Sequence, residues 1–158
     1  MGTYAYYLEL MWSGNRHEIS EDQENYSRDF EVTSNGIKTI LGSADPQFKG
    51  NSEKINPHEL FLASLASSHM LWYLHLCTIE KISVEHYTDS PQGTMEMESN
   101  GTVQFQEIIL KPRIIIDRES KKALAESLHT KALRKCLIAK SVDFPIQIFS
   151  TIGSRSSN

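Results

Sequence analysis

The sequence contains two cysteines, Cys77 and Cys136, whose thiolates could act as nucleophiles toward peroxides and disulfides. Cys77 ends an apolar segment, so it is best interpreted as a small hydrophobic side chain of the core. Cys136 lies close to Arg134, Lys135 and Lys140, and positive charge favours a thiolate. A position near the C-terminal end of a helix opposes this effect. Cys136 is therefore the candidate functional thiol.

Other chemistries have little support. His69 and His75 share a predicted helix, but a spacing of six residues places them about 120° apart around the helix axis. No HExxH or CxxC spacing is present. The residues around Ser68 do not form a GxSxG nucleophile elbow, and the sequence has no P-loop and no dinucleotide fingerprint. We therefore expect no metal and no cofactor.

Length and composition indicate one soluble domain over residues 1–158, because 158 residues with 39% apolar side chains can build one core. The net charge is -4 and the 16 basic residues are scattered among 20 acidic ones, so nucleic acid is not an expected partner. Serines and histidines interrupt the apolar residues 60–77, which favours a buried helix over a membrane span. We expect no signal peptide, and two free thiols then suggest a cytoplasmic location.

The N-terminal part predicts an antiparallel sheet. Residues 3–12 and 28–34 are rich in strand formers, and residues 37–41 follow the Asn35-Gly36 hairpin signal. Ser13-Gly14-Asn15 predicts a turn after the first strand. Residues 42–54 contain Gly, Pro, Asn and charged side chains, which is typical of an ordered loop or of a mobile lid.

A long central helix is predicted over residues 57–81. Asn56 is a good N-cap, Pro57 suits the first helical position, and Glu59 can bond back to the cap. Apolar side chains occur on nearly every side of this helix, so a sheet or another subunit must enclose it. The rest of the chain predicts further strands and a second amphipathic helix that starts at 117–120 and ends near Cys136. The strands are expected at residues 82–88, 94–98, 103–116 (with an edge or bulge at Pro112) and 142–152.

Several segments resemble the OsmC/Ohr family over nearly the whole chain. Residues 56–60 (NPHEL), leading into residues 63–69 (ASLASSH), are similar to the start of the family's central helix. The other similar segments are GSADPQFKG at 42–50, HMLWYLHLC at 69–77, GTM from Gly93, and KCLIAKSVDFP at 135–145.

The resemblance implies an α+β fold in which antiparallel sheets pack around a long central helix in an intertwined homodimer, with active sites at the subunit interface. It also implies a role in oxidative or osmotic stress defence. In the family, a cysteine on the first helix reduces an organic hydroperoxide and becomes a sulfenic acid. A second cysteine then forms a disulfide, which a dithiol reductant, often lipoyl-based, reduces.

Transferred residue by residue, the resemblance places Cys136 at the second cysteine and Ser68 at the attacking one. Serine cannot perform this redox step, because its hydroxyl is weakly acidic and forms no sulfenic acid. The family's loop arginine is absent, and Gln47 or Lys49 lies nearest to its position. Glu59 matches one family acid and is equally explained by helix capping, and His58 replaces the other acid.

Three functions follow as alternatives. The chain is a thiol peroxidase, with Ser68 standing where a native cysteine belongs or with Cys136 acting alone and an external thiol resolving it. Otherwise it binds a small apolar ligand in an interface pocket, lined by residues such as Met70, Trp72 and Tyr73. The third alternative is a degenerate member with a structural or partner-binding role.

Overall fold

The computed structural model describes residues 2–13, 26–34 and 38–155. The turn predicted at Ser13-Gly14-Asn15 lies outside the described residues from Gly14 on, and the turn predicted at Asn35-Gly36 and the last three residues of the chain also lie outside them. Contacts divide the chain into two compact units, Met1–Leu60 and Phe61–Asn158. Each unit is described by itself. The single domain expected over residues 1–158 stays a prediction.

The first unit contains an antiparallel sheet in the order β1-β2-β3, made of β1 (Glu9–Trp12), β2 (Phe30–Thr33) and β3 (Ile40–Gly42). The first strand is shorter than predicted, because the ladder with β2 begins at Glu9 opposite Thr33. Residues 2–8 are rich in tyrosine but form no strand. Strand propensity therefore produced a strand only where a neighbouring chain supplied hydrogen-bond partners.

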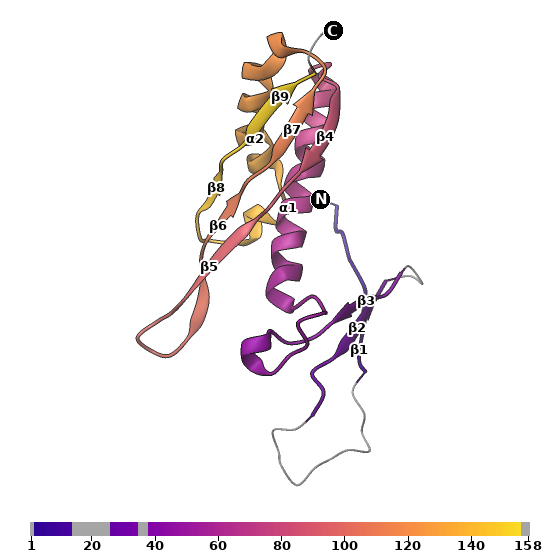
Figure 1. Cartoon of the computed structure of the whole chain (residues 1–158), viewed down its shortest axis with the longest axis vertical. Coiled ribbons are helices and arrows are strands. Elements are labelled where there is room, and N and C mark those ends of the chain that lie inside the picture. The colour runs from indigo at the N-terminus through magenta and orange to yellow at the C-terminus, as the bar shows by residue number, and fades with distance from the viewer. Residues whose placement is uncertain (1, 14–25, 35–37, 156–158) are drawn as a thin grey trace. The chain divides into compact units, whose positions relative to one another are not determined.

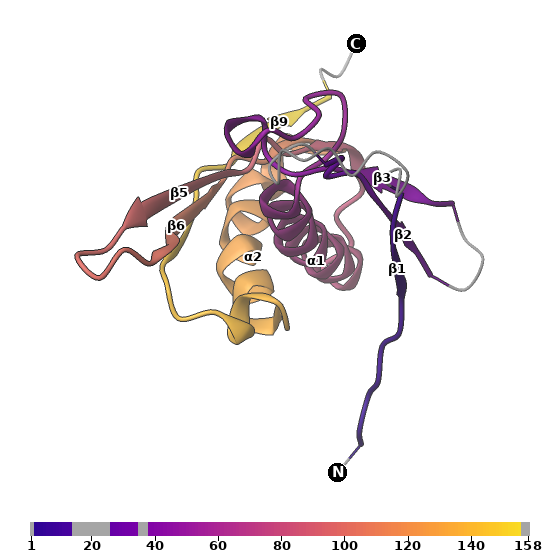
Figure 2. The ribbon, with the colours of Figure 1, turned by 90° about the horizontal axis from the view of Figure 1, so that it is seen from below.

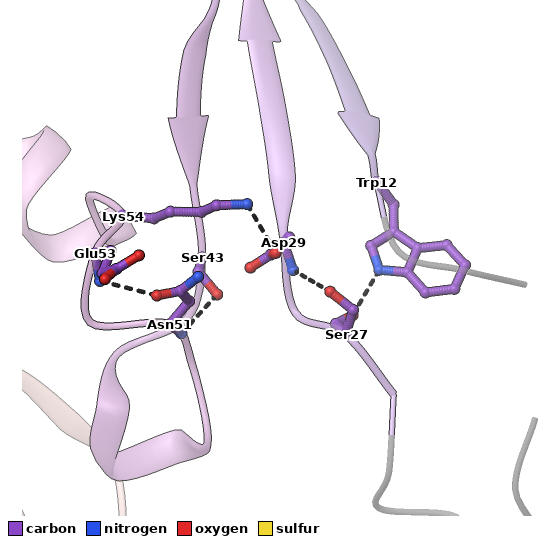
Figure 3. A network of polar contacts seen from close by, with 7 residues as sticks. All are labelled: Trp12, Ser27, Asp29, Ser43, Asn51, Glu53 and Lys54. Atoms are coloured by element: carbon purple, nitrogen blue, oxygen red, sulfur yellow. Dashed lines mark hydrogen bonds and ion pairs between the residues drawn. The ribbon is translucent and has the colours of Figure 1, made fainter. Parts of the chain in front are cut away.

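The predicted loop after β3 is ordered by side-chain contacts (Figure 3). The buried Ser43 hydroxyl accepts a hydrogen bond from the Asn51 backbone N–H at 3.0 Å, and the Asn51 side chain accepts one from the Glu53 N–H at 2.9 Å. The Lys54 ammonium lies 2.7 Å from Asp29 on the strand side of the network. This ammonium and the Ser43 hydroxyl hold the pKa of Asp29 below its usual value. The loop, which includes the short helix η1 (Pro46–Phe48), is therefore a fixed element.

The central helix α1 extends over Pro57–Ile79 and ends two residues earlier than predicted. The Ile82 N–H bonds to the Cys77 carbonyl at 2.8 Å, and the Lys81 N–H bonds to the Thr78 carbonyl at 3.1 Å. These two bonds form a Schellman motif around Lys81, whose φ is 56°. A lysine thus occupies the left-handed position that usually belongs to glycine.

We predict that Lys81→Gly stabilises the protein by roughly 0.5–1 kcal/mol, because glycine adopts positive φ without a Cβ penalty. The measurement is the urea midpoint at unchanged slope. Glu80→Gly is the matched control, since Glu80 does not have positive φ and should lose stability. A lower midpoint for Lys81→Gly would contradict this account of the helix end.

Two three-stranded sheets continue one another in the second unit (Figure 1). One has the order β4-β7-β9 and the other β5-β6-β8. Antiparallel pairs join β4 to β7 and β5 to β6, whereas β8 and β9 pair in parallel with β6 and β7. The strands are β4 (Val84–Thr88), β5 (Gln92–Met97), β6 (Val103–Leu110), β7 (Arg113–Ile116), β8 (Ile146–Ile148) and β9 (Thr151–Ser154).

The strands predicted over 103–116 and 142–152 are each divided into two. Pro112 has no N–H to donate, and β6 ends just before it. The Phe149 N–H bonds to the Leu110 carbonyl and the Thr151 N–H bonds to the Pro112 carbonyl, so the two breaks face each other. The sequence predicted an edge or a bulge at Pro112. The observed effect is larger, because the break at Pro112 separates two sheets.

Helices α1 and α2 (Lys122–Lys135) lie side by side against one face of the sheets (Figure 2). The short helix η2 (Glu119–Lys121) precedes α2 where the sequence predicts the first helical turn, and η3 (Ala139–Ser141) follows it. The larger core cluster joins both helices to β7 and β9, and a second cluster joins the first half of α1 to β6 and β8. The fully buried side chains of the larger cluster include Tyr73, Cys77, Ile116, Ala125, Leu128 and Ala132.

Candidate functional site

Ser68 and Cys136, which are 68 residues apart in the chain, form a direct contact. The Cys136 Sγ donates to Ser68 Oγ at 3.1 Å, and the Ala139 backbone N–H donates to the sulfur at 3.4 Å. Cys136 is fully buried and Ser68 is half-buried. The structure therefore brings together the two positions that the sequence analysis assigned to the family's two cysteines.

The local fold at the end of α2 explains how Cys136 reaches this position. The helix ends at Lys135, and Cys136 has extended backbone angles (φ -64°, ψ 115°). The chain then turns back in η3, where the Lys140 N–H bonds to the Cys136 carbonyl at 3.2 Å. This turn aims the Ala139 N–H at the sulfur, which accepts a backbone hydrogen bond from it.

Cys77 has a different environment, as the sequence predicted. It is fully buried in the larger core cluster. Burial raises the pKa of the Cys77 thiol, and the neighbouring Tyr73 hydroxyl opposes this only in part. The interpretation of Cys77 as a core side chain is confirmed.

A buried histidine pair next to this site was not predicted. His69 Nε2 and His129 Nδ1 lie 3.1 Å apart, and the rings are close to parallel. Burial lowers the pKa of both histidines to about 4, and for His69 the proximity of His129 adds a smaller effect. Among the described residues, no third His, Cys, Asp or Glu completes a metal site. The spacing of Ala125, His129 and Ala132 along α2 could have placed His129 on the buried face, but not opposite His69.

Glu59 and Lys49 belong to the first unit. The Asn56 N–H donates to Glu59 Oε2 at 2.9 Å, and the Glu59 N–H donates to Asn56 Oδ1 at 3.0 Å. This reciprocal pair is a capping box, which confirms the capping role of Glu59. Lys49 ends η1 with a φ of 64°. A catalytic role for either residue stays a prediction from the resemblance.

The apolar pocket predicted at a subunit interface stays a prediction. Trp72 lines an open hollow of about 280 Å³ together with Leu71 and His75. Tyr73 does not line it, because its ring is fully buried and stacks on His129 at 4.1 Å between centroids. Residues 72 and 73 point in different directions because neighbouring helical positions differ by 100°.

Comparison with known proteins agrees with this architecture. Residues 50–150 match the family described as OsmC-like protein. An OsmC-like protein of unknown function from Vibrio cholerae is similar over 94% of this chain and 100% of its own, with 27% identity and a TM-score of 0.85. The organic hydroperoxide resistance protein OsmC of Legionella pneumophila (16% identity, TM-score 0.67) covers 97% of this chain and 99% of its own.

The organic hydroperoxide resistance protein OhrB of Bacillus subtilis has the same fold at 14% identity and a TM-score of 0.60, over 93% of this chain and 98% of its own. No curated protein sequence matches. The predicted OsmC-like α+β fold, with a long helix and mixed sheets, is confirmed. Because the family match covers more than half of the sequence, the chain belongs to the OsmC-like family.

Proposed function

We propose that this protein acts in stress defence by reducing organic hydroperoxides, with Cys136 as the thiol of its site and an external thiol completing the cycle. The observation that carries the proposal is the contact of Cys136 Sγ with Ser68 Oγ and the Ala139 N–H. The Ser68 hydroxyl and the Ala139 N–H thus both contact the Cys136 sulfur, at the position where the resemblance to the family predicts thiol chemistry. Neighbours named organic hydroperoxide resistance proteins support the substrate class.

The chemistry is balanced as follows. The Cys136 thiolate attacks the terminal oxygen of the hydroperoxide, the O–O bond breaks, and the alcohol leaves with a proton. The sulfur is then a sulfenic acid. One external thiol attacks the sulfenic acid, water leaves, and a mixed disulfide forms. A second external thiol then attacks the external sulfur of this disulfide, which releases Cys136 as a thiol and joins the two external sulfurs in a disulfide. A dithiol such as a lipoyl group supplies both thiols.

Ser68 supplies a hydroxyl where the two-cysteine scheme needs a sulfur. Its Oγ can donate a hydrogen bond to the Cys136 thiolate but cannot become oxidised. Cys136 is also fully buried, so the reaction requires the turn after α2 to open toward a substrate. We therefore expect slow turnover compared with a site that has two cysteines.

The test is consumption of cumene hydroperoxide in the presence of dihydrolipoamide, measured for the parent chain, Cys136→Ser and Cys77→Ala. The parent and Cys77→Ala should consume peroxide, and Cys136→Ser should not. Mass spectrometry with a sulfenic-acid trap should find the adduct on the Cys136 peptide. Equal consumption by the parent and Cys136→Ser, at the rate of the reductant alone, would rule the proposal out.

A homodimer is part of the same proposal. Among the described residues, Leu71 and Ile79 on α1 are 63% and 59% exposed, although α1 is apolar on most sides. By length and composition α1 could also cross a membrane. Proteins of the OsmC-like family are soluble, and six side chains of α1 are buried in the core, so a second subunit is the better partner for this surface. A cytoplasmic location is proposed with it.

Ligand binding without turnover is the second candidate function. The hollow beside Trp72 favours it, because an indole and a leucine offer an apolar surface and His75 adds a polar group. Quenching of tryptophan fluorescence by cumene alcohol, lost in Trp72→Leu, would support this function if the peroxide assay is silent.

A further inference from the structure

The histidine pair connects the two helices that carry Ser68 and Cys136. His69 directly follows Ser68 on α1, and Cys136 follows His129 by seven residues, or about two helical turns. His69 and His129 are 0% and 3% exposed. The 3.1 Å contact between Nε2 and Nδ1 is thus a buried polar link between α1 and α2 on the side where the thiol site lies.

The pair can be hydrogen-bonded while both rings are neutral. One ring then donates its N–H and the other accepts with its bare nitrogen, and either direction is compatible with the geometry. The outer nitrogens, His69 Nδ1 and His129 Nε2, have no hydrogen-bond partner among the described residues. An added proton would therefore place a charge on a buried nitrogen with no acceptor for it.

The surrounding groups do not compensate for such a charge. Tyr73 of α1 stacks on His129, and Tyr87 of β4 lies 6.0 Å from Tyr73. Both hydroxyls are neutral well above pH 7, because burial raises their pKa values. Glu126 of α2 and Asp89 after β4 act on these tyrosines and not on the imidazoles. The Cys77 thiol, which also acts on Tyr73, is neutral because burial raises its pKa.

We propose that His69 and His129 are positioning residues which, as a neutral pair, hold the Cys136 thiol against Ser68, and that protonation of either imidazole separates the helices there and exposes Cys136. The proposal does not depend on peroxide reduction, since it concerns access to the thiol and not what the thiol attacks. It predicts that an acidic medium makes Cys136 more accessible, whereas acid normally makes a thiol less reactive.

The experiment is labelling of the full chain with 4,4′-dithiodipyridine between pH 7 and pH 4, with each rate divided by that of glutathione at the same pH. Peptide mass spectrometry measures the labelling of Cys136 and of Cys77 separately. Labelling of Cys77, which is buried in the larger core cluster, reports unfolding of the whole core. If opening requires one proton, its population rises about tenfold for each pH unit between the pKa of an exposed histidine and the pKa of the pair. The normalised rate at Cys136 should therefore rise at least about tenfold, while Cys77 stays protected.

The matched variant is His69→Gln combined with His129→Asn. The Gln amide replaces Nε2 and the Asn amide replaces Nδ1, so the helices keep a hydrogen bond that cannot be protonated in this range. Its Cys136 rate should not change with pH. A parent rate that stays flat, or that rises equally at Cys136 and Cys77, would overturn the proposal without any use of the variant. A variant that keeps the parent's pH profile would overturn it as well.

Discussion

Ser68→Cys is expected to form a disulfide with Cys136 in air, and the cross-link should raise the free energy of unfolding by up to about 4 kcal/mol. The Sγ of Cys136 lies 3.1 Å from the Ser68 Oγ, so the two sulfurs would have to approach by about 1 Å to bond. The stabilisation is large because the bond closes a loop of 68 residues and so restricts the unfolded chain. The intact mass should fall by the two hydrogens that are lost, and the urea midpoint should depend on reductant only in the variant.

The matched control is Ser67→Cys. Ser67 is exposed and its hydroxyl bonds to the Ser64 carbonyl, so a thiol there points away from Cys136. This variant should show neither the mass change nor the effect of reductant. In the peroxide assay, Ser68→Cys should exceed the parent, because both thiols of the family's scheme are then present. If neither Ser68→Cys nor Ser67→Cys forms a disulfide in air, the contact between residues 68 and 136 does not persist in solution.

A loss of roughly 2–4 kcal/mol in the free energy of unfolding is expected between pH 7 and pH 5 from the histidine pair. Burial lowers the folded-state pKa of both residues to about 4, whereas the ordinary value is 6.5. In this window the unfolded chain binds protons that the folded chain does not, so stability falls as the pH falls from about 6.5 toward 4. Below about 4 the folded protein also takes up these protons, and the loss levels off. Urea unfolding at each pH gives the measurement.

The control for this pH effect is His75→Gln, which removes an exposed histidine from the same helix. It should leave the pH dependence unchanged. The His69→Gln and His129→Asn double variant should flatten the curve between pH 7 and pH 5. If the free energy of unfolding of the double variant falls with pH as steeply as that of the parent, the acid sensitivity comes from other groups.

Local signals in the sequence were enough to predict much of the fold. The start of α1 follows from Asn56, Pro57 and Glu59, because a capping box involves neighbours in the sequence. Cys77 could be assigned to the core from its apolar surroundings. The positions of Ser68 and Cys136 came from the family resemblance, and the structure adds that the two side chains touch.

Features that depend on distant residues could not be predicted. The partners in the histidine pair are 60 residues apart, and neither has a local pattern that specifies the other. The strand predicted over 103–116 divides at Pro112, but nothing near Pro112 in the sequence indicates that its two halves pair with β8 and β9 in separate sheets. Tyr73 was expected to line an apolar pocket, but packing against His129 places it in the core.

The parallel strands β8 and β9 also determine when the fold can be completed during synthesis. Each supplies the third strand of its sheet, and Ile152 of β9 is buried in the main core. The ribosome adds β8 and β9 after both helices and after the four other strands of the two sheets. Until β8 and β9 are synthesised, β6 and β7 of the nascent second unit each have one unpaired edge. Stalled or truncated chains that end before Ile146 would expose those edges to other chains, and we expect them to aggregate or to be captured by chaperones.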